Sequence, residues 1–295
     1  MSIKKIEMIN FRNHEDTVFD FSPGINIIWG ENGSGKTSII EAVHILSNGK
    51  SFKTNRLIET ITSNKKEAIV KAVFGDKNMV FHQTKKPSKK IKINNIEKST
   101  KDLVGKNPTV LVSPEEEKIT KGPHSERRRF FDRVFSNISK TYFNNLINYS
   151  TALKNRNTLL KQQKDKHEIE IWNNPLIKYG CQLWEERKLL HSKFNKNIEG
   201  VCGGYNKKVD ITVSLDCPSD TSRNRFKKHL NEKLEKELFL GRTLSGPHLD
   251  KYTTNFNNKD LRVYGSQGEH KLTFLIFKIA EHGFIKNETG KKPTL

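Results

Sequence analysis

The sequence has few cysteines and no long apolar run, and both shortages exclude classes of protein. No apolar stretch approaches the roughly 18 residues that suggest a membrane span. The start, "MSIKKIEMINFRN", has no uninterrupted apolar core, so we expect no signal peptide. The three cysteines are Cys181, Cys202 and Cys217, and none has C-x-x-C spacing. We expect free thiols in a cytoplasmic protein, with no metal site among them and no membrane partner.

Acidic residues are also scarce relative to basic ones. Lys and Arg number 53 against 33 Asp and Glu, which gives a net charge of +20. Such a balance favours polyanionic partners, because neutralising phosphates releases counterions. The alternative is that an A/T-rich genome supplies lysines that only solvate the surface. The densest clusters are Lys85-Lys86, Lys89-Lys90-Lys92 and Arg127-Arg128-Arg129. Few aromatic residues interleave with the lysine clusters, so base stacking is not indicated there.

The pattern of apolar residues predicts an α/β protein. Strands are predicted over residues 3–9, 18–21, 25–29, 68–74, 79–84, 91–96, 109–113 and 209–215. The run 25–29 is nearly all apolar, which is typical of a buried strand. Residues 126–200 have helical periodicity interrupted by "KQQKDKHE", which predicts two long helices. These helices form either an inserted arm or part of the core of one domain.

The C-terminal third alternates between strand and helix signals. A basic amphipathic helix is predicted over 223–239, a hairpin around Asn257-Asn258 and an apolar helix over 272–284. Pro293-Thr294-Leu295 resembles the first residues of a strand. We therefore expect a head with a mixed sheet over 1–120 plus 239–295, and a mainly helical arm over 121–238.

Residues 30–37, "GENGSGKT", match the phosphate-binding loop G-x-x-x-x-G-K-[ST] and lie between a predicted strand and a predicted helix. Glycines let the backbone N–H groups of the loop face a phosphate, and the helix dipole favours its charge. Lys36 is placed to neutralise β/γ-phosphate oxygens and Thr37 to ligate Mg²⁺. The predicted ATP-binding residues are Gly30, Glu31, Asn32, Gly33, Ser34, Gly35, Lys36, Thr37 and Ser38.

An acidic residue at the end of a neighbouring strand would be needed for hydrolysis. "VLVSPEEE" comes nearest, with Glu115–Glu117 behind a predicted strand, but Ser113 and Pro114 intervene and indicate a loop. The catalytic acid is therefore either absent or beyond Leu295.

"SQGEHK" resembles the signature motif of ABC-type ATPases. There the serine and glycine approach the γ-phosphate bound by the opposite subunit. The residues that match are Ser266, Gln267, Gly268 and Glu269. Alone, S-x-G-E is equally consistent with an ordinary helix cap. Its position late in a chain that begins with a phosphate loop favours the signature motif.

Four blocks in order resemble the RecF family, whose members have an SMC-like ABC ATPase head. They are "FRNHEDTVFDFSPGINIIWGENGSGKTSIIEAVHIL", "SPEEEKITKGPHSERRRFFD", "SGPHLD" and "YGSQGEHK". The resemblance implies a weak ATPase that uses ATP and Mg²⁺, dimerises with ATP and clamps DNA. It also implies work with RecO- and RecR-like partners in loading recombinase at single-stranded gaps. In this family an acidic strand follows the signature helix, so we expect a C-terminally truncated member that lacks this acid.

The resemblance also suggests roles for individual residues. Arg12 and Asn13 look like family residues near the nucleotide, although a polar strand end would look the same. The DNA-binding candidates are Lys50, Lys53, Arg127 and Arg128. The lysines could equally be solvated, and the arginines could tie the arm to the core. His248 is expected to be a hydrogen-bonded turn residue, and Asp132 to pair with one of the three adjacent arginines.

Three other functions fit part of the pattern. An ABC transporter ATPase subunit would share both motifs, but the long helical insert and basic charge disfavour it. An SMC-type chromosome protein would need a longer heptad pattern than residues 140–200 supply. A non-hydrolysing, ATP-gated DNA-binding module would fit a chain without its catalytic acid.

Overall fold

The computed structural model describes residues 3–86, 88–205 and 208–295, which fall into two units. One unit contains Met1–Glu115 with Ile285–Leu295, and the other contains Glu116–Phe284. The domains predicted above differ in joining residues 239–284 to the N-terminal part, and that division remains a prediction.

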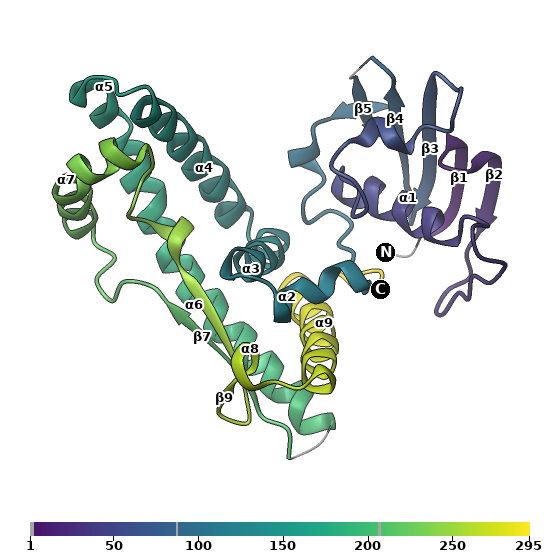
Figure 1. Cartoon of the computed structure of the whole chain (residues 1–295). Coiled ribbons are helices and arrows are strands. Elements are labelled where there is room, and N and C mark those ends of the chain that lie inside the picture. The colour runs from purple at the N-terminus through teal and green to yellow at the C-terminus, as the bar shows by residue number, and fades with distance from the viewer. Residues whose placement is uncertain (1–2, 87, 206–207) are drawn as a thin grey trace. The chain divides into compact units, whose positions relative to one another are not determined.

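The first unit is built on a six-stranded antiparallel sheet with the order β2-β1-β3-β4-β5-β6 (Figure 1). Its strands are β1 (Ile3–Phe11), β2 (His14–Asp20), β3 (Glu67–Phe74), β4 (Lys77–Thr84), β5 (Lys89–Ile93) and β6 (Ile96–Lys98). Cross-strand pairing aligns Met8, Val70, Phe81 and Ile91 in one buried row. Helix α1 (Lys36–Asn48) packs its apolar stripe on this face, because Ile39, Ala42, Ile45 and Leu46 recur at helical spacing.

The loops of this unit contain short 3-10 turns, η1 (Leu57–Thr60) and η2 (Thr100–Asp102). The predicted strand 91–96 is two strands, because Asn94 and Asn95 take positive φ angles of 49° and 64° and turn the chain. The predicted strand 109–113 is reduced to one isolated parallel bridge between Thr109 and Thr294. That bridge is the single parallel pairing in the described part of the chain, so the sheets are antiparallel rather than mixed.

The predicted buried strand 25–29 is wrong. These residues form no strand, and the side chains of Ile25, Ile27 and Trp29 are 90%, 83% and 88% exposed. A strand needs a hydrogen-bonded neighbour, and no described residue pairs with this segment. β2, which precedes it, forms the sheet edge and pairs with β1 alone. Apolar composition therefore does not decide secondary structure where the pairing partner is missing.

The second unit is mainly helical. Its helices are α2 (Lys118–Lys121), α3 (His124–Ile138), α4 (Lys140–Lys161), α5 (Lys166–Ile171), α6 (Asn173–Tyr205), α7 (Arg223–Leu240) and α8 (Leu261–Tyr264). Helix α9 (Gln267–Thr289) begins here and ends in the first unit. The first predicted long helix is divided at Ser139 into α3 and α4, and the second is α6. Helices α4 and α6 pack side by side (Figure 1). A three-stranded antiparallel sheet joins β7 (Ile211–Asp216), β8 (Lys251–Phe256) and β9 (Lys259–Asp260), with η4 (Pro247–Leu249) before β8. The hairpin at Asn257-Asn258 and the α/β fold class are confirmed.

A buried arginine ties the second unit together. Arg187 of α6 is 1% exposed and donates to Asp132 of α3 at 2.8 Å and to Asp250 at 2.6 Å. It also donates to the Pro247 carbonyl and the Tyr142 hydroxyl, so its donors reach α3, α4 and the turn η4 with its cap Asp250. Asp132 is structural, as predicted, but its arginine partner is Arg187. The predicted pairing with one of the adjacent arginines is wrong.

Replacing Arg187 with alanine should remove the positive charge that pairs with buried Asp250 and partly buried Asp132. We expect the free energy of unfolding to fall by about 3–5 kcal/mol, the usual cost of breaking a buried ion pair by removing one partner. Urea unfolding followed by circular dichroism measures the change.

Arg129→Ala is the matched control. Arg129 is 76% exposed and pairs with Glu126 one helical turn away, so its removal should cost about 0.5 kcal/mol or less. Equal effects of the two substitutions would contradict the role given to Arg187.

Candidate functional site

The N-terminus of α1 lacks the usual cap. Gly35 precedes the helix with φ 96°, no side chain of the described residues caps it, and the first turn has no acidic residue. The first backbone N–H groups of a helix have no partner within the helix, and the dipole makes this end positive. The start of α1 is therefore suited to bind an anion.

Glycine is required at several points of the loop in front of α1. Gly30, Gly33 and Gly35 have φ angles of 148°, 86° and 96°, a range that residues with a side chain rarely adopt. A Cβ on Gly35 would lie 2.4 Å from His14 Nε2 and 2.6 Å from Asn13 Oδ1. The spacing of glycines that predicted a phosphate loop thus matches the backbone that the loop adopts.

Lys36 lies across the loop. Its Nζ donates to the carbonyl oxygens of Gly30 and Glu31, both at 2.7 Å. Thr37 is exposed at the first turn, whereas Ser38 is 6% exposed and its Oγ lies 3.4 Å from Asn13 Oδ1. The predicted residues 30–38 therefore form one continuous loop and helix start, with the Ser38 side chain directed inward.

The turn between β1 and β2 braces this loop. Asn13 Nδ2 donates to the Gly33 carbonyl at 3.0 Å. The ring of His14 is buried, and its Nε2 lies 3.2 Å from the Gly35 carbonyl. His14 was missed in the sequence, where its position beside Asn13 was the only available signal. Both side chains hold the loop backbone from the side of the sheet.

Arg12 contacts α1 itself. Its Nε and Nη2 donate to Glu41 at 2.9 and 2.6 Å, and its Nη1 donates to the Glu59 carbonyl. Glu41 is fully buried and also accepts from Ser51 Oγ at 2.5 Å. Glu41 was missed in the sequence because its partner is 29 residues away. The guanidinium of Arg12 is thus already paired, and its predicted proximity to a nucleotide stays a prediction.

The signature residues begin α9 with a reciprocal cap. Glu269 N–H donates to Ser266 Oγ at 3.2 Å, and Ser266 N–H donates to Glu269 Oε2 at 2.7 Å. These hydrogen bonds hold the pKa of Glu269 below its usual value. A Cβ on Gly268 would meet no atom nearer than 4.0 Å. The interpretation as a helix cap is therefore correct, while contact with a phosphate of a second subunit stays a prediction.

Glu116, part of the nearest candidate for a catalytic acid, is held in ion pairs. Residues 114–117 form a 3-10 turn, η3 (Pro114–Glu117). Glu116 accepts from Arg133 at 2.6 Å and from Lys278 of α9 at 2.8 Å. Burial alone would raise the pKa of Glu116, but hydrogen bonds and charges from these two cations outweigh it and lower the pKa to about 2. The carboxylate thus ties the signature helix to α3.

The predicted DNA contact of Arg127 is wrong. Arg127 is 3% exposed, and it donates to the carbonyls of Tyr252 and Gly122 at 2.7 and 2.9 Å. Arg128 is partly buried and donates to the Asp250 carbonyl at 2.6 Å. These arginines tie α3 to the segment around β8, within one unit. The lysine candidates Lys50 and Lys53 are exposed.

His248 is a partly buried, hydrogen-bonded turn residue, as expected. Its Nδ1 lies 2.6 Å from the Tyr149 hydroxyl and its Nε2 lies 3.2 Å from the Thr243 carbonyl. Burial lowers the pKa of His248 to about 4, so the ring is neutral near pH 7. The G-P-H segment therefore stabilises the fold around η4.

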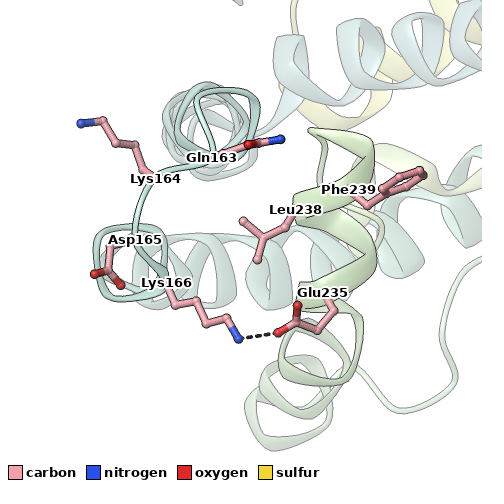
Figure 2. A pocket seen from close by; sticks show the side chains of 7 residues that line it. All are labelled: Gln163, Lys164, Asp165, Lys166, Glu235, Leu238 and Phe239. Carbon is pink, nitrogen blue, oxygen red and sulfur yellow. Dashed lines mark hydrogen bonds and ion pairs between the residues drawn. The ribbon is translucent and has the colours of Figure 1, made fainter.

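The described part of the second unit contains cavities away from these motifs. One of about 580 Å³ is bounded by the turn after α4 and the end of α7, where Lys166 pairs with Glu235 (Figure 2). Another of about 460 Å³ is lined by Trp184, Cys217, His229 and Asp250, among others. Neither contains a residue of the phosphate loop or the signature.

Comparison with known proteins decides the family. A family model described as "AAA domain" matches residues 5–260. DNA replication and repair protein RecF of Alkaliphilus oremlandii is 34% identical, with 100% of this chain and 85% of that protein aligned. The RecF of Clostridium novyi is 35% identical over 100% of this chain and 84% of that protein. The chain belongs to the RecF family.

Solved structures agree with this assignment. A structure of "the recombination mediator protein RecF-ATP in RecFOR pathway" has a TM-score of 0.91 and 29% identity, covering 99% of this chain and 83% of that one. The SMC head domain from Pyrococcus furiosus, at a TM-score of 0.55 and 16% identity, shows likeness of fold alone. In the described part of this RecF-family chain, no helix is long and apolar enough to span a membrane.

The lowered pKa of Glu116 predicts an acid-dependent stability. A carboxylate whose pKa falls on folding stabilises the native state above its unfolded pKa, near 4.5, and loses that contribution as the pH falls towards 2. We expect Glu116→Gln to remove up to about 3 kcal/mol at pH 6 and much less at pH 3. Urea unfolding at a series of pH values measures this. Glu115→Gln, an exposed neighbour, should leave the profile unchanged, and parallel profiles for both variants would contradict the assignment.

Proposed function

We propose that this chain binds ATP at the loop 30–38 and uses it to close a dimer on DNA during replication and recombinational repair. The observation that carries the proposal is the uncapped start of α1 behind a positive-φ glycine loop. The RecF–ATP structure that resembles 99% of the chain supports it. Shared family membership argues against a transporter ATPase subunit.

The residues of the loop suit a nucleoside triphosphate with Mg²⁺. The free N–H groups of the first helical turn would receive phosphate oxygens. Lys36 now bonds two loop carbonyls and would exchange them for phosphate oxygens. The exposed hydroxyl of Thr37 fits a ligand of Mg²⁺, a hard cation that prefers oxygen and retains several waters. The bound ion would neutralise phosphate charge, while Asn13 and His14 keep the loop in position.

Dimerisation and DNA binding complete the proposal. Ser266, Gln267, Gly268 and Glu269 would face the nucleotide of a second subunit. The charge of +20 and the exposed lysines Lys50 and Lys53 support contact with single-stranded or gapped DNA. By family, proteins like RecO and RecR are the partners in loading recombinase. Turnover would be slow, and a non-hydrolysing, ATP-gated DNA-binding module remains the second candidate because Glu116 is held by Arg133 and Lys278.

Lys36→Ala should abolish ATP binding and the ATP-dependent part of DNA affinity. The variant loses the side-chain cation placed over the loop, and we expect ATP to bind at least about 100-fold more weakly, or about 3 kcal/mol. Isothermal titration calorimetry measures the affinity. Lys71→Ala removes the same charge from a pair with Glu7 on the sheet and should bind ATP normally. Unchanged affinity in Lys36→Ala would refute the site.

Ser266→Arg should spare ATP binding but prevent ATP-driven dimerisation, because a bulky cation would occupy the start of α9. Sedimentation velocity with and without ATP measures the monomer–dimer equilibrium. Ser222→Arg is the matched control, since Ser222 caps α7 by accepting from Arg225 N–H at 3.3 Å. The Ser222→Arg variant also loses a helix cap and gains a positive charge, but at the start of α7, so it should still dimerise with ATP. An ATP-driven dimer of Ser266→Arg would rule out the signature role.

A further inference from the structure

Lys89 and Lys50, 39 residues apart in the chain, lie at the same end of α1. Alternation along β5 puts Lys89 on the face of Ile91 and Ile93, which is the face that α1 covers. Its Nζ donates to Thr100 Oγ1 at 2.8 Å and to the Gly49 carbonyl at 3.3 Å. Lys50 follows Gly49 directly. The fold thus brings the Lys89 ammonium and the Thr100 hydroxyl together beyond the C-terminus of α1, in the first unit, next to the residue that precedes Lys50.

This cluster of positive charge has no acidic partner in the described part of the chain. Neither Lys50 nor Lys89 forms an ion pair with a described carboxylate, in contrast to Lys71 of the same sheet, which pairs with Glu7 at 2.6 Å. Burial and the charge of Lys50 both lower the pKa of Lys89, which indicates that the two cations destabilise one another. A bound anion would relieve that repulsion.

The chain around the cluster is rich in lysine, although alternation along β5 directs Lys90 and Lys92 to the opposite face of the sheet from Lys89. The lysines of segment 85–106 are Lys85, Lys86, Lys89, Lys90, Lys92, Lys98, Lys101 and Lys106, against the acids Glu97 and Asp102 alone. Asp102 is engaged by the N–H and hydroxyl of Ser99. A single small anion would satisfy one or two of these cations, whereas a chain of phosphates can contact several in succession.

We propose that Lys89, Lys50 and the Thr100 hydroxyl form a binding site for a phosphate of the DNA backbone. The site rests on the proposed function, since it presupposes that the protein binds DNA. The proposal assigns a DNA-phosphate contact to Lys89, a residue in an edge hairpin of the sheet. It also places Lys50 in the same site as Lys89. Thr100 is placed to donate its hydroxyl to a phosphate oxygen while it accepts from Lys89.

The test measures DNA affinity as a function of salt. Wild type, Lys50→Gln, Lys89→Gln and Lys71→Gln are titrated with a fluorescent gapped duplex by anisotropy, at saturating ATP and Mg²⁺, from about 50 to about 200 mM salt. Removing one true phosphate contact should reduce the slope of log K against log salt by about 0.9 and weaken binding about eightfold near 0.1 M salt. Lys71→Gln removes the same net charge outside the cluster, so its slope should match wild type.

Two checks keep the outcomes distinct. Glutamine at position 89 retains a donor for Thr100, and the Lys50 side chain makes no hydrogen bond to a described residue, so thermal melting and ATP affinity should stay at wild-type values. Slopes equal to that of Lys71→Gln would overturn the site while DNA binding stands. The DNA site would also be overturned if millimolar inorganic phosphate, at constant ionic strength, removed the difference in DNA affinity between Lys50→Gln and wild type. That result would indicate a site for free phosphate. A wild type that binds no DNA would overturn the proposed function and this site together.

Discussion

The first turn of α1 presents backbone N–H groups that no described side chain caps, and the loop in front of it is arranged around that deficit. Left buried without a partner, such groups would cost about 1–3 kcal/mol each. Glycines at positive φ keep side chains away from them, and Lys36 bonds the loop carbonyls in place of an anion. Asn13 and His14 fix the loop from the neighbouring strand turn. The start of α1 is therefore suited to an anion, and its backbone N–H groups have no side-chain hydrogen-bond partner among the described residues.

The second unit reaches rigidity by another route, through buried charges. Arg156 and Glu237 pair at 2.7 Å with both side chains fully buried, and they join α4 to α7. Arg187 joins α6 to α3 through Asp132, and Lys278 joins α9 to Glu116 of η3. Taking such ions out of water costs several kcal/mol each, so their net contribution to stability is small even where removing one partner is very costly. What they supply is directionality: each guanidinium bonds several elements at fixed angles, which long helices packed by apolar stripes alone would not ensure.

The sequence predicted those parts of the fold that depend on residues close together in the chain. The phosphate loop, the helix after it, the two long helices and the pairing of β8 with β9 all follow from spacing or turn chemistry. Asn257 and Asn258, which predicted one turn, have φ angles of 48° and 64°. Asn94 and Asn95 have nearly the same angles, 49° and 64°, but no turn was predicted there. Segment 25–29 was predicted wrongly because burial of a strand depends on a neighbour, which periodicity does not report. Arg127, Glu41 and His14 were misjudged or missed because their partners lie 125, 29 and 21 residues away.

The start of α9 has one role that the structure shows, a helix cap, and a second that is proposed, contact with a phosphate. Ser266 and Glu269 satisfy each other's backbone N–H groups, which are the groups that a phosphate would also seek at the start of α9. A cap of this kind is worth about 1 kcal/mol, far less than a charge-assisted phosphate contact assembled from several donors. The cap can therefore stabilise the helix start in the absence of a partner and still be displaced by a fully charged phosphate. Gly268 leaves the approach open, since an added Cβ there would meet nothing nearer than 4.0 Å. In the proposed dimer the serine and the glutamate would therefore serve both the cap and the phosphate contact, whereas Gly268 takes no part in the cap.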